Sequence, residues 1–377
     1  MEQAPMAIPN TNRPFRPVAQ RGGRPGSLQS WSTAYTRTSD ALQPPGGKET
    51  LTMTKSATIP GLRVGDLVEV RSAEEILATL DERGELENLP FMPEMLGFCG
   101  RRLTVHKVAH KLCDTISGSG IHRMDNAVHL TDSRCDGSAH GGCQTACSLY
   151  WKEAWLKRVG PGTPTSSVSG RIEIPLLEVN TRKEPGPDGR PRYSCQATEL
   201  MRAAPTCLPF RDLGQYVTDV KTGNAGPIDS IKAFLVSLFN RLQDASRRRL
   251  PRKLWFRDGL PWGFVAGKAV GRTPTAHLNL QPGEMVRIKT KDQIMLTLNE
   301  DRLNRGMGFE EEMARYCGRT ARVQARVTKC IDEKTGELLT MKNPCIVLAD
   351  VVCSGAYNAN CPREFVPFWR EIWLERI

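Results

Sequence analysis

The chain lacks the long hydrophobic segments that membrane and secreted proteins need. None of its 377 residues belongs to an apolar run of 18 or more, so a membrane span is not expected. The N-terminus has no apolar core of the kind a signal peptide carries. We therefore expect a cytoplasmic protein with no membrane partner. Its twelve cysteines should stay reduced or bind metal, since disulfides are rare in a reducing compartment.

Signatures of common enzyme and binding classes are also missing. The sequence has no Walker A loop, Rossmann glycine fingerprint or nucleophile elbow, and no zinc-finger spacing or RNA-binding aromatic motif. These absences give little weight to NTPase, dinucleotide-dependent and serine hydrolase functions. Whether the chain is an enzyme, and what oligomer it forms, stays open at this point.

Positive charge is concentrated in two parts of the chain. Of the net +11, residues 1–64 and 160–282 carry +5 and +8, whereas residues 65–159 and 283–377 carry −3 and +1. A basic run such as RRRLPRK at 247–253 can bind nucleic-acid phosphates through counterion release. Because no recognised reader motif accompanies it, a solvated surface is the better interpretation.

The sequence contains an internal repeat of one unit. A shift of 218 positions places residues 65–159 on residues 283–377 without a gap. GDLVEVRS aligns with GEMVRIKT, FCGRR aligns with YCGRT, and YWKEAWLKRV aligns with FWREIWLERI. Each copy is expected to begin with an alternating strand, followed by a helix with a capping box. The two boxes are Ser72 with Glu75, and Thr290 with Gln293.

Later segments of both copies predict further matching elements. Strands are expected through Leu103–Val108 and Val323–Val327, and near Ala127–Leu130 and Cys345–Leu348. A short helix is expected to close each copy, because two tryptophans recur four positions apart and would share one helix face. These pairs are Trp151 with Trp155 and Trp369 with Trp373.

Together these patterns predict an α+β, β-rich fold of two tandem small SH3-like barrels with short helices, joined by a partly helical linker. The first cysteine-rich barrel is expected at 61–159, the linker at 160–282 and the second barrel at 283–377. Residues 1–60 are rich in Pro, Gly, Ser, Thr and Arg, and predict a disordered basic tail.

The linker is expected to contain a helix near 227–245. Pro227 suits its first turn, and apolar residues follow at helical spacing: Ile231, Phe234, Leu235, Leu238 and Leu242. We expect this apolar face to pack and to hold the two barrels together.

Four segments, FCGRR, RCDGSAHGGC, YWKEAWL and YSCQATEL, carry a resemblance to a protein family. The chain resembles uncharacterised bacterial proteins with duplicated cysteine-containing SH3-like units, which occur in biosynthetic gene neighbourhoods. The resemblance covers most of residues 61–377. It implies a bacterial cytoplasmic setting and brings neither an activity nor residue roles.

Three cysteines of the first copy recur at matching positions in the second. Cys99, Cys135 and Cys143 coincide with Cys317, Cys353 and Cys361. Thiolates are soft donors that bind zinc or iron–sulfur clusters, and either centre normally takes four ligands. Three shared cysteines fall one short of that number. The alternative is that they are small buried hydrophobic residues.

Candidates for the fourth ligand differ between the copies. In the first copy Cys147 follows Cys143 by one helical turn, and Cys195 of the linker or Cys113 can substitute for it. In the second copy Phe365 takes the position of Cys147, so the ligand would be Cys207, Cys330 or Cys345. This difference weakens the idea of two identical sites.

Histidines are concentrated in the first copy, which holds five of the six. His140 lies between the cysteines and can serve as a ligand or proton donor, with Asp136 as a nearby acceptor. His106 and His110 lie on one face of a predicted strand and can line a pocket. Arg101 and Arg102 are candidates for binding an anionic cofactor or substrate. Ordinary surface or core roles are the alternative for each of them.

The leading hypothesis is a cysteine-ligated metal or iron–sulfur protein. In its sharper form it is a metalloenzyme of bacterial biosynthetic metabolism, acting on a small substrate. The alternative is a nucleic-acid- or protein-binding adaptor with structural zinc or buried free thiols, using the basic linker. The first hypothesis depends on His140 and Cys147, and the second on Arg247–Arg249.

Overall fold

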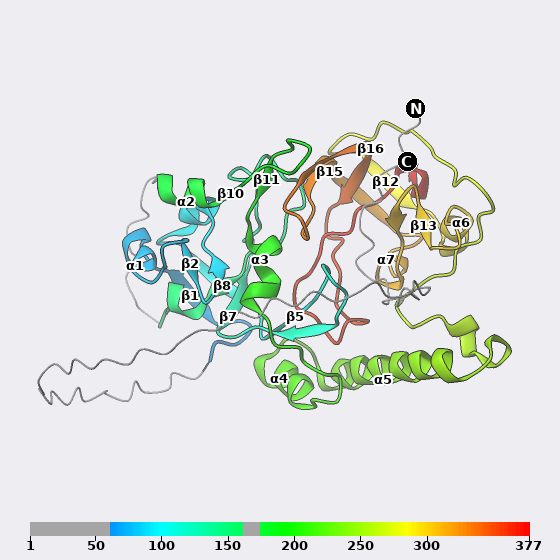
Figure 1. The fold of residues 1–377 in the computed structure, drawn as a ribbon, viewed down its shortest axis with the longest axis horizontal. Helices are drawn as coiled ribbons and strands as arrows, with labels where there is room; N and C mark the ends of the chain where they lie inside the picture. Colours follow the sequence, from blue (N-terminus) through cyan, green and yellow to red (C-terminus); the bar gives the residue numbers. More distant parts are fainter. Residues whose placement is uncertain (1–60, 161–173) are drawn as a thin grey trace, which may run out of the picture. The chain divides into compact units, whose positions relative to one another are not determined.

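The computed structural model describes residues 61–160 and 174–377. They form a mixture of helices and small antiparallel sheets (Figure 1). The basic tail predicted for residues 1–60 lies outside the described residues. Among the helices of the described ranges, none has both the length and the apolar content needed to cross a membrane.

The first repeat is built on a five-stranded antiparallel sheet with strand order β8-β7-β4-β1-β9. The strands are β1 (Leu67–Val70), β4 (Arg102–Val108), β7 (Ala127–Leu130), β8 (Trp151–Lys152) and β9 (Leu156–Arg158). Val68, Val105 and Val128 are almost fully buried and contribute to the first core. The chain also forms two short ribbons, β2 (Glu85–Leu86) with β3 (Leu89–Pro90) and β5 (Lys111–Cys113) with β6 (Ile121–Arg123).

The second repeat forms a four-stranded sheet with order β16-β15-β12-β17. Its strands are β12 (Met285–Ile288), β15 (Thr320–Ile331), β16 (Leu338–Leu348) and β17 (Leu374–Arg376), and a ribbon pairs β13 (Leu303–Asn304) with β14 (Met307–Gly308). Leu67 pairs with Thr104 in the first sheet, and Met285 with Arg322 in the second. Both partners shift by the same 218 positions, so the strand register repeats with the sequence.

Short helices follow the first strand of each repeat, as predicted. They are α1 (Ala73–Leu77) and α6 (Lys291–Met295), and both capping boxes are confirmed. The 3-10 helix η1 (Pro93–Phe98) and α7 (Glu311–Ala314) then occupy matching places before β4 and β15.

The closing segment of each repeat is not the predicted helix. Trp151 lies in β8, and Trp155 ends the 3-10 turn η2 (Glu153–Trp155), which leads directly into β9. In the second repeat the corresponding turn is η5 (Glu371–Trp373), followed by β17. All four tryptophans are fully buried. A strand followed by a tight turn aims both rings at the core just as a helix would, which is why the four-residue spacing suggested a helix.

Residues 174–282 do more than link the repeats. They form α2 (Pro175–Asn180), β10 (Arg182–Lys183), β11 (Arg192–Tyr193), α3 (Gln196–Ala203), α4 (Gly214–Thr222), α5 (Pro227–Arg249), η3 (Arg252–Leu254) and η4 (Phe256–Gly259). Leu177 and Leu200 belong to the first core, whereas Val265 and Leu280 belong to the second. The predicted linker therefore completes both cores.

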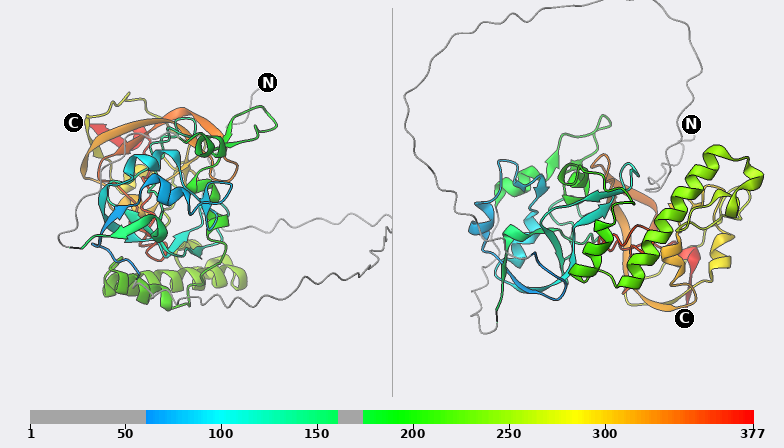
Figure 2. Two further views of the ribbon diagram at one scale, coloured as in Figure 1. Left: turned by 90° about the vertical axis from the view of Figure 1, so that its left-hand side faces the viewer. Right: turned by 90° about the horizontal axis from the view of Figure 1, so that it is seen from below.

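The helix predicted near 227–245 is present as α5 and extends to Arg249 (Figure 2). The expected packing face is only partly confirmed. Ile231, Leu235 and Leu242 are 60%, 49% and 61% exposed, whereas Phe234 packs in a cluster that includes Ile121 of the first repeat and Ala359 of the second. The helix buries Ala233 and Val236 on another side, and it packs on α4. The exposed run Arg247–Arg249 lies in the last turn, where positive charge complements the helix dipole.

A buried ion pair joins α4 to the first repeat. Asp219 is fully buried and accepts hydrogen bonds from Lys111 Nζ at 2.6 Å and from the ring of His110 at 2.8 Å. Lys111 is fully buried as well. Removing one member of such a pair leaves an uncompensated buried charge, which is strongly unfavourable.

Replacing Asp219 alone should therefore destabilise the protein severely. We expect Asp219→Ala to lower the free energy of unfolding by about 3–5 kcal/mol, measured by urea denaturation. Asp229→Ala is the control, because Asp229 pairs with Lys232 at an exposed site, and it should change stability by less than about 0.5 kcal/mol. Similar losses in both variants would contradict the assigned role of Asp219.

His129 in β7 predicts a loss of stability in acid. Its Nδ1–H donates to the Leu149 carbonyl at 2.9 Å, and burial lowers its pKa from 6.5 to about 4. The unfolded chain binds the proton near pH 6.5. The contribution of neutral His129 to the free energy of unfolding is therefore complete above pH 6.5 and is lost as the pH falls toward 4. The matching residue of the second repeat is Val347. Between pH 6.5 and pH 4, the free energy of unfolding of His129→Val should fall by about 3 kcal/mol less than that of the wild type, measured by urea denaturation. An unchanged pH dependence would contradict the assignment.

Candidate metal centre

The loop between β7 and β8 carries three cysteines and His140 on a tightly curled backbone. The Gly137 carbonyl accepts hydrogen bonds from the backbone N–H groups of His140 at 3.1 Å and Gly142 at 3.0 Å. Gly137 has a positive φ of +73°, and a Cβ there would lie 1.9 Å from the Cys143 carbonyl oxygen. Only glycine fits this position, because any side chain would push Cys143 away.

The second repeat folds the same loop from a different sequence. The Gly355 carbonyl accepts from the N–H groups of Asn358 at 2.8 Å and Asn360 at 2.9 Å. A Cβ on Gly355 would lie 2.3 Å from the Cys361 carbonyl oxygen. The backbone is thus shared, and the chemistry of the two loops depends on the side chains they carry.

Glu94, Cys135 and His140 bring three potential ligand atoms together in the first repeat. Cys135 Sγ lies 3.3 Å from Glu94 Oε1 and 3.4 Å from His140 Nε2, and the three ligand atoms all lie within 4.8 Å of one another. In a tetrahedral zinc site with bonds of about 2.0–2.3 Å, neighbouring ligand atoms are about 3.5 Å apart. The three side chains can therefore hold a metal ion.

Two polar atoms of this group lack a hydrogen bond. Within the described ranges, Glu94 Oε2 and His140 Nδ1 are buried and make no hydrogen bond, although His140 Nδ1 lies 3.7 Å from Glu94 Oε1. Buried polar groups are nearly always hydrogen-bonded, and each exception costs about 1–3 kcal/mol. Glu312, which matches Glu94 in the second repeat, accepts from the Ser354 N–H at 3.0 Å and the Ser354 hydroxyl at 2.9 Å. Glu312 is thus fully hydrogen-bonded where Glu94 is not, although Asn360 Nδ2 of the second loop is also buried without a hydrogen bond.

Burial disfavours the charged form of all three residues. It raises the pKa of Glu94 and lowers the pKa of His140 to about 4. Burial also raises the pKa of the Cys135 thiol, and the nearby Glu94 carboxylate adds to this effect. A bound cation would reverse these tendencies for Cys135 and Glu94, because metal ligands bind in their deprotonated forms.

The three residues line a pocket that contains further cysteines. Its wall includes Cys143, Cys147 and Cys195, and its cavity volume is about 30 Å³. Burial raises the pKa of Cys147, and it raises that of Cys195 to about 12. Four of the predicted cysteine ligands therefore meet at one pocket together with His140, which was also predicted.

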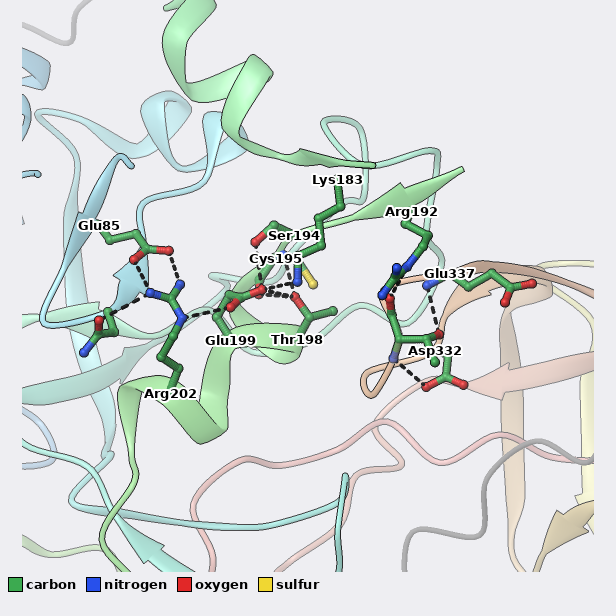
Figure 3. Close-up of polar contacts among 12 residues, drawn as sticks. Glu85, Lys183, Arg192, Ser194, Cys195, Thr198, Glu199, Arg202, Asp332 and Glu337 are labelled. Atoms are coloured by element: carbon green, nitrogen blue, oxygen red, sulfur yellow. Dashed lines mark hydrogen bonds and ion pairs between the residues drawn. The ribbon is translucent and has the colours of Figure 1, made fainter. Parts of the chain in front are cut away.

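Cys195 reaches the pocket from the N-cap of α3, and a polar network fixes this helix (Figure 3). The Glu199 carboxylate accepts from Lys183 Nζ at 2.5 Å and from the Ser194 hydroxyl at 2.9 Å. Arg202 forms an ion pair with Glu85 of β2 (Figure 3). These contacts anchor both ends of α3 and hold Cys195 in position.

The other cysteines predicted as ligands lie elsewhere. Cys99 is buried in the first core, and Cys317 packs against the second. Cys353 Sγ accepts from the Gly355 N–H at 3.3 Å, and Cys361 Sγ accepts from the Cys113 N–H at 3.1 Å. The second repeat also has Asn358 where the first has His140. The arrangement of the first loop is thus not repeated in the second.

The remaining acidic and histidine candidates have structural contacts outside the pocket wall. Asp136 is exposed and accepts from the Ser138 N–H at 2.8 Å. The His106 ring lies 2.7 Å from a Glu364 carboxylate oxygen, and the ring of His110 contacts the buried Asp219. His106 and His110 therefore connect segments of the fold and do not form the pocket that the sequence suggested.

The two candidate arginines also make ordinary contacts. Arg102 Nε lies 3.1 Å from a Glu69 carboxylate oxygen in the neighbouring strand. The Arg101 guanidinium lies 5.1 Å from the centre of the Phe98 ring. Pairing with a nearby glutamate and stacking on an aromatic ring account for both side chains.

The sequence interpretation missed two acidic residues of the pocket, Glu94 and Glu333. Glu94 could have been found, because the shift of 218 positions places it on Glu312. Glu333 comes from the second repeat, in the turn between β15 and β16. No motif marks it, since only the folded chain brings it to the first loop.

Comparisons with known proteins found no matching family model, no matching curated protein and no matching solved structure. The geometry of the pocket therefore carries the functional inference.

Substituting Gly137 should open the cysteine loop. We expect Gly137→Ala to displace Cys143 and to increase alkylation of Cys135 and Cys143 several-fold, measured by mass spectrometry on the native protein. Gly142→Ala is the matched control, since Gly142 has the same φ of +73° and no described atom within 4 Å of an added Cβ. The control therefore introduces the same backbone strain as Gly137→Ala but no steric clash. Equal labelling in both variants would contradict the role assigned to the Gly137 contact.

Proposed function

We propose that the first repeat binds one zinc ion through Glu94, Cys135 and His140, and that the protein is a metalloprotein. The main support is the convergence of three potential ligand atoms within 4.8 Å of one another, in a group where Glu94 Oε2 and His140 Nδ1 are buried and make no hydrogen bond. A mixed set of sulfur, nitrogen and oxygen ligands suits zinc, whereas iron–sulfur clusters are normally held by cysteines. Zinc is therefore the preferred metal.

We further propose that the fourth coordination position faces the pocket. Three protein ligands and one open position are typical of catalytic zinc sites, whereas four protein ligands are typical of structural ones. Zinc with an open position would act as a Lewis acid or activate a bound water. The adaptor hypothesis corresponds to the other case, in which Cys143, Cys147 or Cys195 completes a structural site.

The protein contributes a shaped and partly dry environment. Met92, Leu149 and Ala197 line the pocket and lower its polarity. Gln196 donates from Nε2 to the carbonyl oxygens of Pro90 at 3.0 Å and Tyr150 at 2.9 Å, which holds the start of α3 against the first repeat. The cavity has a volume of about 30 Å³, which has room for a metal-bound water or a ligand of similar size. We therefore favour an enzyme that acts on a small substrate over a macromolecular adaptor.

The sheets support a fold proposal as well. In each repeat the first strand of the sheet pairs with the last one. β1 lies between β4 and β9, and β12 lies between β15 and β17. Pairing of the first strand with the last is how a small barrel closes. We propose that these sheets are the two SH3-like units of the bacterial proteins that the sequence resembles.

The metal content of matched variants tests the proposal. The wild type should contain about one zinc per chain by elemental analysis, and His140→Asn and Cys135→Ser should lower zinc affinity at least about tenfold. His140→Asn copies Asn358 of the second repeat, and Cys353→Ser is the control at the position that matches Cys135. The control should keep its zinc.

Two outcomes would overturn the assignment. Zinc retained in both His140→Asn and Cys135→Ser would place the metal elsewhere. Iron with acid-labile sulfide and broad visible absorption, in protein purified without oxygen, would replace zinc by an iron–sulfur cluster held by cysteines.

A further inference from the structure

A second group of cysteines joins the two repeats outside the proposed metal centre. Cys113 ends β5 of the first repeat, and Cys361 lies in the cysteine loop of the second. The Cys113 backbone N–H donates to Cys361 Sγ at 3.1 Å. Two cysteines separated by 248 positions are thus in direct contact, and both are free thiols.

Arg363 holds this contact together. It is 5% exposed, and its guanidinium donates to the Cys113 carbonyl at 3.2 Å and the Thr115 hydroxyl at 2.9 Å. It also pairs with Glu333 at 3.1 Å and lies over the Phe365 ring at 4.0 Å. The segment after β5 is therefore clamped against the second cysteine loop.

The surroundings of Cys361 favour a thiolate. Burial opposes ionisation, but hydrogen bonds from the Cys113 thiol and the Arg363 N–H, together with the Arg363 guanidinium, lower the pKa of Cys361 to about 7. The Lys111 ammonium, which is paired with Asp219, the Cys353 thiol and the Tyr150 hydroxyl also act on this pair. A thiolate is the nucleophilic form of cysteine.

We propose that Cys113 and Cys361 form a reversible disulfide between the repeats when the protein meets hydrogen peroxide. The Cys361 sulfur attacks one peroxide oxygen, the O–O bond breaks, and a sulfenic acid and one water form. The Cys113 sulfur then attacks the Cys361 sulfur, the S–S bond forms, the S–O bond breaks, and a second water leaves. The two thiols lose two electrons to the peroxide, and a dithiol reductant returns them.

The disulfide would act next to the proposed metal pocket without using its ligands. Glu333 lines that pocket and also pairs with Arg363, which contacts Cys113. Oxidation would therefore move Cys113 and Arg363, and Arg363 is paired with the pocket residue Glu333. The inference itself does not require a bound metal, since Glu94, Cys135 and His140 take no part in the reaction.

Peptide mapping of the oxidised full-length protein tests the proposal. Protein treated with a small excess of hydrogen peroxide should lose two of its twelve thiols. Digestion without reductant should yield one linked pair of peptides that contain Cys113 and Cys361, and dithiothreitol should restore both thiols. A dominant link between other cysteines, or no link while the thiols stay free, would overturn the proposal.

Variants separate the two steps of the reaction. Cys113→Ser should leave a sulfenic acid on Cys361 that dimedone traps, and Cys361→Ser should abolish both the linked peptides and the trapped acid. Cys207→Ser is the control, because Cys207 is exposed, and it should form the link at the wild-type rate. Peptide mapping of the wild type needs no variant, so it decides the matter even if a substitution prevents folding.

Discussion

The candidate site depends on one backbone constraint, the contact between Gly137 and Cys143 that closes the cysteine loop. With no side chain at position 137, the chain can curl until the Gly137 carbonyl meets two N–H groups of the same loop. This curl brings His140 back toward Cys135, and Glu94 of η1 completes the group. The loop can be this tight because a five-stranded sheet supports both of its ends, through β7 and β8.

The two repeats show how one backbone can serve different chemistry. Both loops close on a glycine, and both place a cysteine near a buried glutamate. In the second repeat Ser354 satisfies Glu312, and Asn358 replaces histidine. In the first repeat Glu94 Oε2 and His140 Nδ1 are buried and make no hydrogen bond. The second loop instead presents Cys361 to Cys113. The two loops thus share a backbone and differ in the side chains on which the two proposals rest.

Much of the architecture could be predicted because burial imposes a period on the sequence. Alternating apolar residues marked β1 and β12, and the internal repeat predicted matching strands in both copies. The registers of these strands also match, as Leu67 with Thr104 and Met285 with Arg322 show. The same rules failed where two structures share a period. The tryptophan pair at 151 and 155 fits a helix and also a strand followed by a tight turn. The apolar face of α5 marked a helix but could not show that Leu235 stays exposed. Within the site, the loop cysteines and His140 could be predicted from their spacing in the sequence. Glu333 could not, because it reaches the pocket only through tertiary contacts.

The central claim is that a metal ion binds at Glu94, Cys135 and His140, and its most direct test is an anomalous difference map from crystals of the full chain grown with zinc. Data collected on both sides of the zinc absorption edge should give one strong peak within about 2.0–2.3 Å of Cys135 Sγ, a His140 ring nitrogen and a Glu94 oxygen. A peak elsewhere, or fully ordered side chains with no peak at this position, would contradict the account.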